Sequence, residues 1–388
     1  MSSIIPTLVA AGVSSVKRVV RSMIVTATLL GAGYVQASEL VVGQVAPLSG
    51  MEASQGRAYS AGMQLLFDAV NRVGGVNGHS FKLVRRDDGG RPAETVSATK
   101  QMLAEHKALI LAGYFGGRNV GELVASGILE RERIALIGYR VAEIRPETPW
   151  LYNVRASLSE EVNRIIAHLA IIGITRLGLF YEDGQSAQAL IATADDAAKR
   201  ARIAVVSRAS YPAGTASVAA SVRVFLKSAP QAIILVSSGA AAATFIEQYR
   251  GAGGAAQLVA HSGADSEQLA KRLAEEQMQG VAISQVTPNP YKMSSPLTKE
   301  FTDLVAKSRN LEVPVSYAMI EGYITAKVIV EAVRRQGARP SRETLPKSIE
   351  SINNWDLAGY PLDFRPDQHT GSKFVELSIV TMTGKILQ

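Results

Sequence analysis

The chain has 388 residues, of which 47% are hydrophobic and 19% charged, and it contains no cysteine. This composition is typical of a globular protein of two or three domains. The absence of cysteine excludes disulfides, thiol nucleophiles, thiolate metal sites and the lipid-modified cysteine of a bacterial lipoprotein. The formal net charge of +7 is spread along the chain without a basic tract, so we expect no nucleic-acid partner.

The first 37 residues have the pattern of a secretory signal peptide. Lys17, Arg18 and Arg21 precede a mostly apolar stretch from Met23 to Val35, and Val35-Gln36-Ala37 fits a signal-peptidase site. The alternative is a membrane anchor, but spanning a bilayer takes roughly 20 apolar residues. Cleavage would remove three basic and no acidic residues, which lowers the net charge from +7 to +4. We therefore expect a soluble periplasmic protein without a lipid anchor.

We predict that the mature protein begins at or near Ser38, because the basic segment, the short apolar stretch and the small-residue motif all end there. N-terminal sequencing of periplasmic material measures this directly. An intact Met1 recovered from a membrane fraction would contradict the prediction.

Strand-like and helix-like segments alternate after the signal. The expected strands are residues 40–46, 80–88, 108–114 and 134–139, and the expected helices are residues 55–72, a segment from Pro92 onward, and residues 120–132. Pro92 suits the first turn of its helix. Asn119 and Glu122 have the spacing of an N-cap and capping box for the helix at 120–132.

The same alternation resumes after Arg155. A helix around residues 162–169 leads to a strand at 176–183, and helices then alternate with strands at 203–207, 232–238 and 256–262. Two successive helices are expected between Pro296 and about Gly337, and residues 373–387 have the pattern of a hairpin-like end. Strands separated by helices predict parallel sheets with right-handed crossovers, arranged here as two doubly wound lobes.

Ligands of open parallel sheets bind beyond the carboxyl ends of the strands. The loops to consider are therefore those that follow expected strands: PLSGMEASQG (47–56), YFGGRNVG (114–121), GYRVAE (138–143), YEDGQSAQ (181–188), SSGAAA (237–242) and HSGADS (261–266). In the second loop, adjacent glycines and an arginine lie where a strand turns into a helix, and such a turn suits an anion.

The motifs of nucleotide enzymes and hydrolases are absent. No G-x-G-x-x-G follows the first strand, and neither G-x-x-x-x-G-K-[ST], G-x-S-x-G nor H-E-x-x-H occurs. Asp87-Asp88 could belong to a metal or acid–base site, but the end of a strand explains the pair better. The five histidines (79, 106, 168, 261 and 369) are isolated, and we expect most of them at the surface or on helix faces. We therefore expect no enzymatic activity, no metal and no cofactor.

Three segments resemble a known family. VGQVAPLSG (42–50), AGMQLLFDAVNRVGGVNGHSFKLVRRDDGGRP (61–92) and LYNVRASLSEE (151–161) are similar to periplasmic substrate-binding proteins of the leucine/isoleucine/valine-binding type. The resemblance implies a type I periplasmic-binding-protein fold whose two α/β lobes are joined by three hinge crossings. It also implies a monomeric solute receptor of an ABC transporter, with permease and ATPase subunits as partners. The expected first lobe comprises residues 38–156 and 286–357, and the second residues 157–285 and 358–388.

The resemblance also locates the ligand, and this chain departs from the family there. Amino-acid binders have a serine in the turn that matches Phe115-Gly116-Gly117, and here Gly117 takes its place. In the next turn, IGYRVA, Tyr139 and Arg140 replace small residues. In the second lobe, Ser262 matches the acidic residue that holds the ligand's ammonium. Ser238 matches an aromatic residue, and the usual YG is replaced around Ser186. Because an unpaired ammonium is costly to bury, these departures disfavour an α-amino acid.

Arg140 and the nearby Arg118 instead suit a carboxylate. Arg118 could alternatively be a solvated residue at a helix start, and Arg140 could form a surface salt bridge. As a residue lining a cleft, Arg140 is expected to contribute little to the stability of the core. The residues expected to bind the ligand are Gln55, Phe115, Gly116, Gly117, Arg118, Tyr139, Arg140, Ser186, Ser238 and Ser262.

The expected function is binding of a small organic acid, or a related polar solute, for an ABC transporter. Two alternatives stay open: a periplasmic sensor subunit that signals to a membrane receptor, and a binder of an amino acid, amide or urea.

Overall fold

The computed structural model describes residue 1 and residues 38–141, 148–184, 186–308, 311–380 and 386–387. The expected signal peptide, residues 1–37, lies outside these residues apart from Met1. Among the helices described, none is long and apolar enough to cross a membrane.

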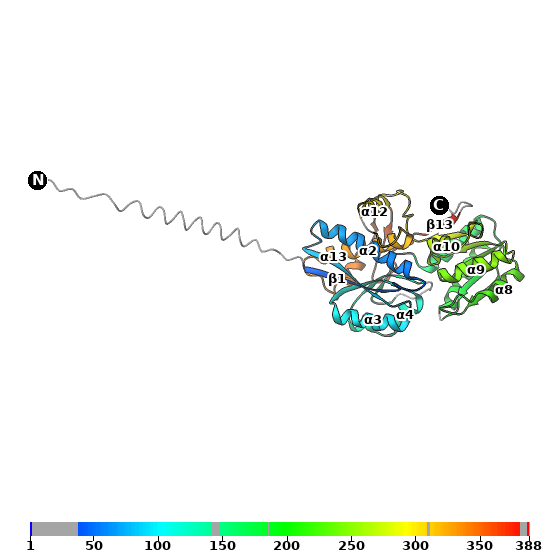
Figure 1. Ribbon diagram of the computed structural model, residues 1–388, viewed down its shortest axis with the longest axis horizontal. Helices are drawn as coiled ribbons and strands as arrows, with labels where there is room; N and C mark the ends of the chain where they lie inside the picture. Colours follow the sequence, from blue (N-terminus) through cyan, green and yellow to red (C-terminus); the bar gives the residue numbers. More distant parts are fainter. Residues whose placement is uncertain (2–37, 142–147, 185, 309–310, 381–385, 388) are drawn as a thin grey trace. The chain divides into compact units, whose positions relative to one another are not determined.

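The first lobe is built on a five-stranded sheet with the order β2-β1-β3-β4-β5, in which β1, β3, β4 and β5 pair in parallel. In Figure 1, α2 and α13 lie on one side of β1, and α3 and α4 lie on the other. The strands are β1 (Ser38–Ala46), β2 (His79–Asp87), β3 (Ala108–Phe115), β4 (Leu136–Arg140) and β5 (Leu151–Tyr152); the helices are α2 (Ala53–Arg72), α3 (Pro92–Glu105), α4 (Gly117–Ala125), α5 (Ile128–Arg131), α12 (Pro296–Lys307), α13 (Tyr317–Gln336) and α14 (Leu345–Glu350).

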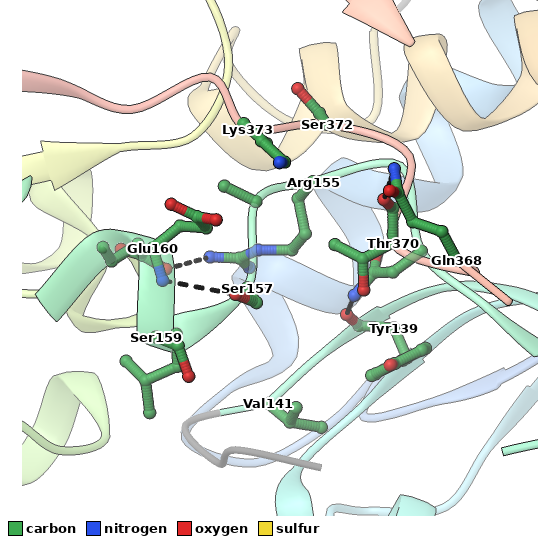
Figure 2. Close-up of a pocket in the computed structure, with 14 residues that line it drawn as sticks. Tyr139, Val141, Arg155, Ser157, Ser159, Glu160, Gln368, Thr370, Ser372 and Lys373 are labelled. Carbon is green, nitrogen blue, oxygen red and sulfur yellow. Dashed lines mark hydrogen bonds and ion pairs between the residues drawn. The ribbon is translucent and has the colours of Figure 1, made fainter. Parts of the chain in front are cut away.

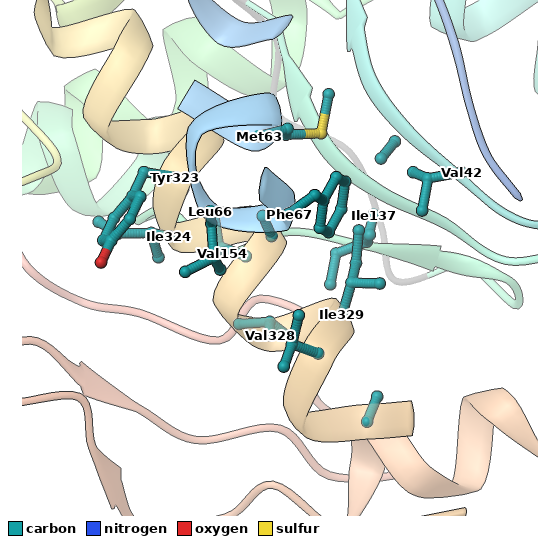
Figure 3. Close-up of a cluster of buried hydrophobic side chains, with 14 of the residues drawn as sticks. Val42, Met63, Leu66, Phe67, Ile137, Val154, Tyr323, Ile324, Val328 and Ile329 are labelled. Carbon is teal, nitrogen blue, oxygen red and sulfur yellow. The ribbon is translucent and has the colours of Figure 1, made fainter. Parts of the chain in front are cut away.

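The largest hydrophobic core lies between this sheet and the helices α2 and α13. Figure 3 shows Met63, Leu66 and Phe67 of α2, at helical spacing, beside Ile324 and Val328 of α13. The two helices approach closely through glycine. A Cβ atom on Gly62 would lie 1.8 Å from the carbonyl oxygen of Met319, and one on Gly322 would lie 2.1 Å from that of Tyr59. These glycines therefore set the distance at which α13, although distant in sequence, covers the first sheet.

The second lobe is built on a seven-stranded sheet with the order β14-β13-β10-β9-β8-β6-β7. The pairs from β6 to β10 are parallel, whereas β13 pairs antiparallel with β10 and with β14. One core joins this sheet to α6 and α7, and another joins it to α8 and α9. The strands are β6 (Arg176–Glu182), β7 (Ala204–Tyr211), β8 (Ala232–Val236), β9 (Gln257–Ala260), β10 (Ala282–Gln285), β13 (Glu376–Val380) and β14 (Ile386–Leu387); the helices are α6 (Leu158–Ile171), α7 (Ala187–Ala201), α8 (Ala219–Ser228), α9 (Gly239–Gly251), the 3-10 turn η1 (Ser262–Ala264), α10 (Ser266–Arg272) and α11 (Glu275–Met278).

The predicted α/β fold with two doubly wound lobes is confirmed. A short antiparallel pair, β11 (Trp355–Asp356) with β12 (Pro361–Leu362), precedes the last crossing. Tyr360, Leu362 and Phe364 are buried in the core formed by α2 and α13. We therefore propose that the first lobe extends to Phe364 and that the last crossing lies between Phe364 and Glu376, later than residue 357.

Local structure differs from the sequence prediction around α4. The expected helix at 120–132 is two helices, because Gly127 has a left-handed φ of 65° between them. The predicted cap at Asn119 is wrong, since the N-cap of α4 is Gly116. The amide of Asn119 is instead buried, and its Nδ2 donates to Oγ1 of Thr95 at 2.7 Å. The side chain of Asn119 therefore makes a tertiary hydrogen bond instead of capping the helix.

Candidate functional site

The six loops that the sequence singles out come together at a cavity of about 250 Å³ at the carboxyl ends of the strands of both lobes. Two further loops also line it: the loop after β2 on the first lobe and the loop after β7 on the second. The lining residues are Pro47, Ser49, Met51, Glu52, Gly89, Gly90, Pro92, Phe115, Gly116, Gly117, Arg118, Asn119, Arg140 and Val141 on the first lobe, and Glu182, Gly214, Thr215, Ser237, Ser238, Ala240, His261 and Gly263 on the second.

Some of the expected binding residues line this cavity and others do not. Those that line it are Phe115, Gly116, Gly117, Arg118, Arg140 and Ser238. Tyr139 lines a different cavity, described below. Gln55 is buried beneath the first loop, where its Nε2 donates to Oε2 of Glu52 at 2.9 Å. Ser186 is the N-cap of α7 and lies outside the lining set.

The turn between β3 and α4 forms one wall. Gly116 has a φ of 90°, and its N–H donates to the carbonyl oxygen of Arg140 at 2.9 Å. A Cβ atom there would lie 2.8 Å from Oδ1 of Asn119, so this turn requires glycine. The N-terminus of α4 has no side-chain cap and begins at the cavity-lining Gly117. Its positive end therefore favours negative charge in the cavity.

The pair Asp87-Asp88 supports these loops. Oδ1 of Asp87 accepts from the backbone N–H groups of Leu48 and Gly89, each at 2.8 Å. The buried Asp88 accepts from Oγ1 of Thr95 at 2.6 Å and from Nδ2 of Asn119 at 3.3 Å. Asp87 therefore holds the loop after β2 to the loop after β1, and Asp88 holds it to Thr95 of α3 and Asn119 of α4.

Arg140 is a buried residue that also faces the cavity. Its side chain is 5% exposed, and Nη1 donates to Oε2 of Glu321 of α13 at 2.7 Å. Its Nε has no hydrogen-bond partner within the described part of the chain. The expectation that Arg140 contributes little to the core is therefore wrong, because its removal would leave Glu321 in the interior without its nearest cation.

Two carboxylates in the cavity wall were missed by the sequence analysis. Glu52 lies in the first loop, and burial raises the pKa of its carboxyl group. Glu182 ends β6, and it accepts from the Tyr211 hydroxyl at 2.7 Å and from the N–H of Gly214 at 3.2 Å. Both residues lie in loops that the sequence had singled out. They were overlooked because acidic residues were sought only at the position of Ser262.

His261 and Ser237 are further lining residues that the sequence analysis missed. His261 is 1% exposed and Ser237 fully buried. Neither the ring nitrogens of His261 nor Oγ of Ser237 has a hydrogen-bond partner among the residues described. Burial lowers the pKa of His261 to about 4, so the imidazole is neutral at ordinary pH. No local pattern around His261 distinguished it from an exposed histidine.

A buried ionic network lies next to the cavity. Nη2 of Arg155 lies 3.2 Å from Oε1 of Glu161, and Nη1 lies 3.7 Å from Oε1 of Glu321. Glu161 also accepts from the N–H of Ser262 at 2.8 Å and from Oγ of Ser284 at 2.6 Å. Burial alone would raise the pKa of Glu161, but Arg155 and these donors hold it below its usual value. The Ser262 side chain, which was expected to contact the ligand, is thus committed to Glu161 and Arg155.

This network connects the two lobes at the crossing segments. Arg155 follows β5, Glu161 lies on α6 of the second lobe and Glu321 lies on α13 of the first. The hydroxyl of Tyr360 contacts two crossings at once, with the carbonyl oxygens of Val154 and Val286 each at 2.9 Å. The hinge is therefore a packed, hydrogen-bonded structure.

A second cavity, of about 260 Å³, lies at the same crossings. Figure 2 shows Arg155 extending toward the start of α6, with Lys373 and Ser372 above it and Tyr139 and Val141 on the opposite side. This cavity is bounded by the segments that join the lobes and contains side chains of both charges. It extends from the crossing segments to the end of β4, where Val141 lines both cavities.

Comparison with known proteins agrees with this architecture. A family profile described as periplasmic binding protein matches residues 39–381. A substrate-binding periplasmic protein from Ralstonia solanacearum has a similar structure, with a TM-score of 0.83 and 33% identity over 90% of this chain and 99% of that one. The Leu/Ile/Val-binding protein homolog 8 of Brucella abortus is 22% identical over 346 residues, which is 84% of each chain.

A protein described as a fatty acid ABC transporter substrate-binding protein, from Thermomonospora curvata, has the same fold at lower identity. Its TM-score is 0.79 at 19% identity, over 90% of this chain and 92% of that one. The match to the family profile extends over nearly all of the chain after residue 38, through both sheets and the crossings. The chain belongs to the periplasmic binding protein family, with the type I fold of the leucine/isoleucine/valine-binding group.

Proposed function

We propose that this protein is the periplasmic solute-binding subunit of an ABC transporter and that it binds a small organic acid in the cavity between its lobes. Membership of the periplasmic binding protein family supports the role and the location. The related proteins include one described as an ABC transporter substrate-binding protein. The partners would accordingly be a membrane permease and its ATPase.

The observation that carries the choice of an acid is the wall formed by the β3–α4 turn. The N-terminus of α4, which has no side-chain cap, and the exposed Arg118 lie on this wall of a cavity of about 250 Å³. The positive end of the helix dipole and a guanidinium together favour a carboxylate. Because both lobes contribute lining residues, a bound solute would contact both and stabilise the arrangement in which they are closed around it.

A second candidate is an amino-acid-like solute, and Glu52 and Glu182 favour it. In the sequence, a ligand with an ammonium group is disfavoured because Ser262 stands where related amino-acid binders have an acidic residue. Glu182 on the second lobe and Glu52 on the first offer carboxylates to the same cavity. Glu182 already accepts two hydrogen bonds, whereas Glu52 accepts one from Gln55. The organic acid remains our first choice because Arg118 and the positive end of α4 favour its carboxylate, whereas Glu52 and Glu182 already accept hydrogen bonds from the protein.

Mass spectrometry of the ligand released from protein purified without refolding tests the proposal. We expect a small carboxylic acid. Unfolded and refolded protein should then regain that acid, with a higher melting temperature and a smaller radius of gyration. A zwitterionic amino acid would favour the second candidate. A neutral sugar-like solute, or an acid that leaves the scattering profile unchanged, would contradict the proposal.

A further inference from the structure

Several cavity-lining residues have buried polar atoms without a hydrogen-bond partner in the described part of the chain. Within the described residues, Nε of Arg140, Oγ of Ser237 and both ring nitrogens of His261 make no hydrogen bond. All three residues line the cavity, and their exposed fractions are 5%, 0% and 1%. Buried polar groups without partners are rare because each costs free energy. Arg140 faces the cavity from the first lobe, and Ser237 and His261 face it from the second, so a solute bound between the lobes could supply the missing partners.

His261 lies in the loop after β9, which lines the cavity. A Cβ atom on Gly263, which lines the cavity too, would lie 2.5 Å from Nε2 of His261, so the ring packs against this loop. The charged groups near the ring are Glu161, Arg155 and Arg140. Arg155 is paired with Glu161, and Arg140 with Glu321, so the charges around the ring balance. Because the charges around His261 balance, this part of the cavity suits an uncharged polar group of the solute better than a charged group in addition to its carboxylate.

We infer that His261, Ser237 and Nε of Arg140 form a subsite for a hydroxyl or carbonyl oxygen, so that the bound solute is a hydroxy or oxo acid. This inference rests on the proposed binding of an organic acid. A neutral imidazole offers one donor and one acceptor, a serine hydroxyl offers both, and Nε of arginine donates. A hydroxyl group has one donor and two acceptor sites, so it can make one hydrogen bond with each of the three residues, using one ring nitrogen of His261; a carbonyl oxygen can accept from the donors among them. A hydrocarbon chain placed there would leave the three residues unpaired, which is how such sites reject deoxy analogues.

Calorimetric titration with matched acids tests the inference. The refolded, ligand-free protein is titrated with lactate and propionate, 2-hydroxyisovalerate and isovalerate, mandelate and phenylacetate, and with valine as the amino counterpart. At least one hydroxy acid should bind about tenfold more tightly than its deoxy partner, the size expected for one well-made hydrogen bond. Valine should bind more weakly than 2-hydroxyisovalerate.

Variants then assign the preference to the subsite. His261→Leu should reduce the affinity for the hydroxy acid to that of its deoxy partner, with little change for the partner itself. His261→Gln should keep part of the preference, because an amide retains a donor and an acceptor. His168→Leu, which alters a histidine of α6 that does not line the cavity, should behave as the wild type. If His261→Leu does not fold, Ser237→Ala provides the same comparison.

The possible outcomes distinguish the subsite from the proposed binding of an organic acid. If acids bind but hydroxy and deoxy partners bind equally, or if the preference survives in His261→Leu and Ser237→Ala, the subsite is refuted while the organic-acid proposal stands. Tighter binding of valine than of 2-hydroxyisovalerate also refutes the subsite. If none of the acids binds, the organic-acid proposal fails, and the subsite fails with it.

Discussion

Replacing Arg155 with methionine is expected to lower the free energy of unfolding by about 3–5 kcal/mol, the usual cost of removing one partner from a buried ion pair. Arg155 is 4% exposed, and it lies 3.2 Å from Glu161 and 3.7 Å from Glu321. Methionine fills a similar volume but leaves two interior carboxylates with less compensation. Equilibrium unfolding in urea, monitored by circular dichroism, measures the loss.

Two controls make this result specific to the buried charges. The double variant Arg155→Met with Glu161→Gln should recover part of the loss, since it removes one of the uncompensated carboxylates. Lys299→Met removes one partner of the exposed pair with Asp303, whose side chains are 64% and 49% exposed. It should change the stability by less than about 1 kcal/mol. A loss in Arg155→Met no larger than in Lys299→Met would mean that the network does not hold the crossings.

The ionic network of Arg155 lies between the hinge and the cavity. Arg155 follows β5 at the first crossing, and its two carboxylate partners come from α6 and α13, which belong to different lobes. Glu321 also binds Arg140, which lines the cavity. The cavity and the hinge are therefore joined by a continuous chain of buried ionic contacts. A ligand that forms a hydrogen bond with Arg140 would contact a side chain that also pairs with Glu321 of the hinge network.

The alternation of strands and helices was sufficient to predict the fold, because the periodicity of a buried strand or an amphipathic helix is a local property of the sequence. The order of the loops also located the cavity, since the carboxyl ends of parallel strands meet at one edge. Phe115 to Arg118 were found in this way. The break at Gly127 was missed because it depends on one backbone conformation inside an otherwise helical pattern.

The residues that were misjudged depend on tertiary contacts. Ser262 occupies the expected loop, but its side chain bonds to Glu161, which is 101 residues away in sequence. His261 follows β9, whose Leu258 and Ala260 lie in the core with α8 and α9, and a single sequence carries no local mark of its burial. Glu182 could have been found, as it stands in a loop already singled out. The resemblance to amino-acid binders placed the acidic position at Ser262, whereas the carboxylate in this lobe is at Glu182.

Arg118→Ala and Arg140→Ala are expected to weaken binding of the organic acid by comparable factors and to differ in their effect on folding. If Arg118 donates to the ligand carboxylate and Nε of Arg140 donates to the hydroxyl or carbonyl oxygen of the ligand, each variant loses a hydrogen bond from a charged donor of about 1.5–3 kcal/mol. This corresponds to roughly 10- to 150-fold in affinity. Arg118 is exposed and makes no ion pair within the described part of the chain, so the melting temperature of Arg118→Ala should equal that of the wild type. Arg140→Ala should melt well below the wild type, because Glu321 is left in the interior without its nearest cation.

Lysine at the two positions separates charge from geometry. Arg140→Lys should restore much of the melting temperature, since an ammonium can still pair with Glu321, but only part of the affinity, since it cannot reproduce the planar fork. Arg118→Lys should retain more of its affinity, because an exposed side chain can adjust its position. Calorimetry and thermal unfolding of the same preparations give both quantities for each variant. Unchanged affinity in Arg140→Ala, together with its lower melting temperature, would make Arg140 a support for Glu321 alone. Arg118 and the N-terminus of α4 would then be the groups that hold the carboxylate.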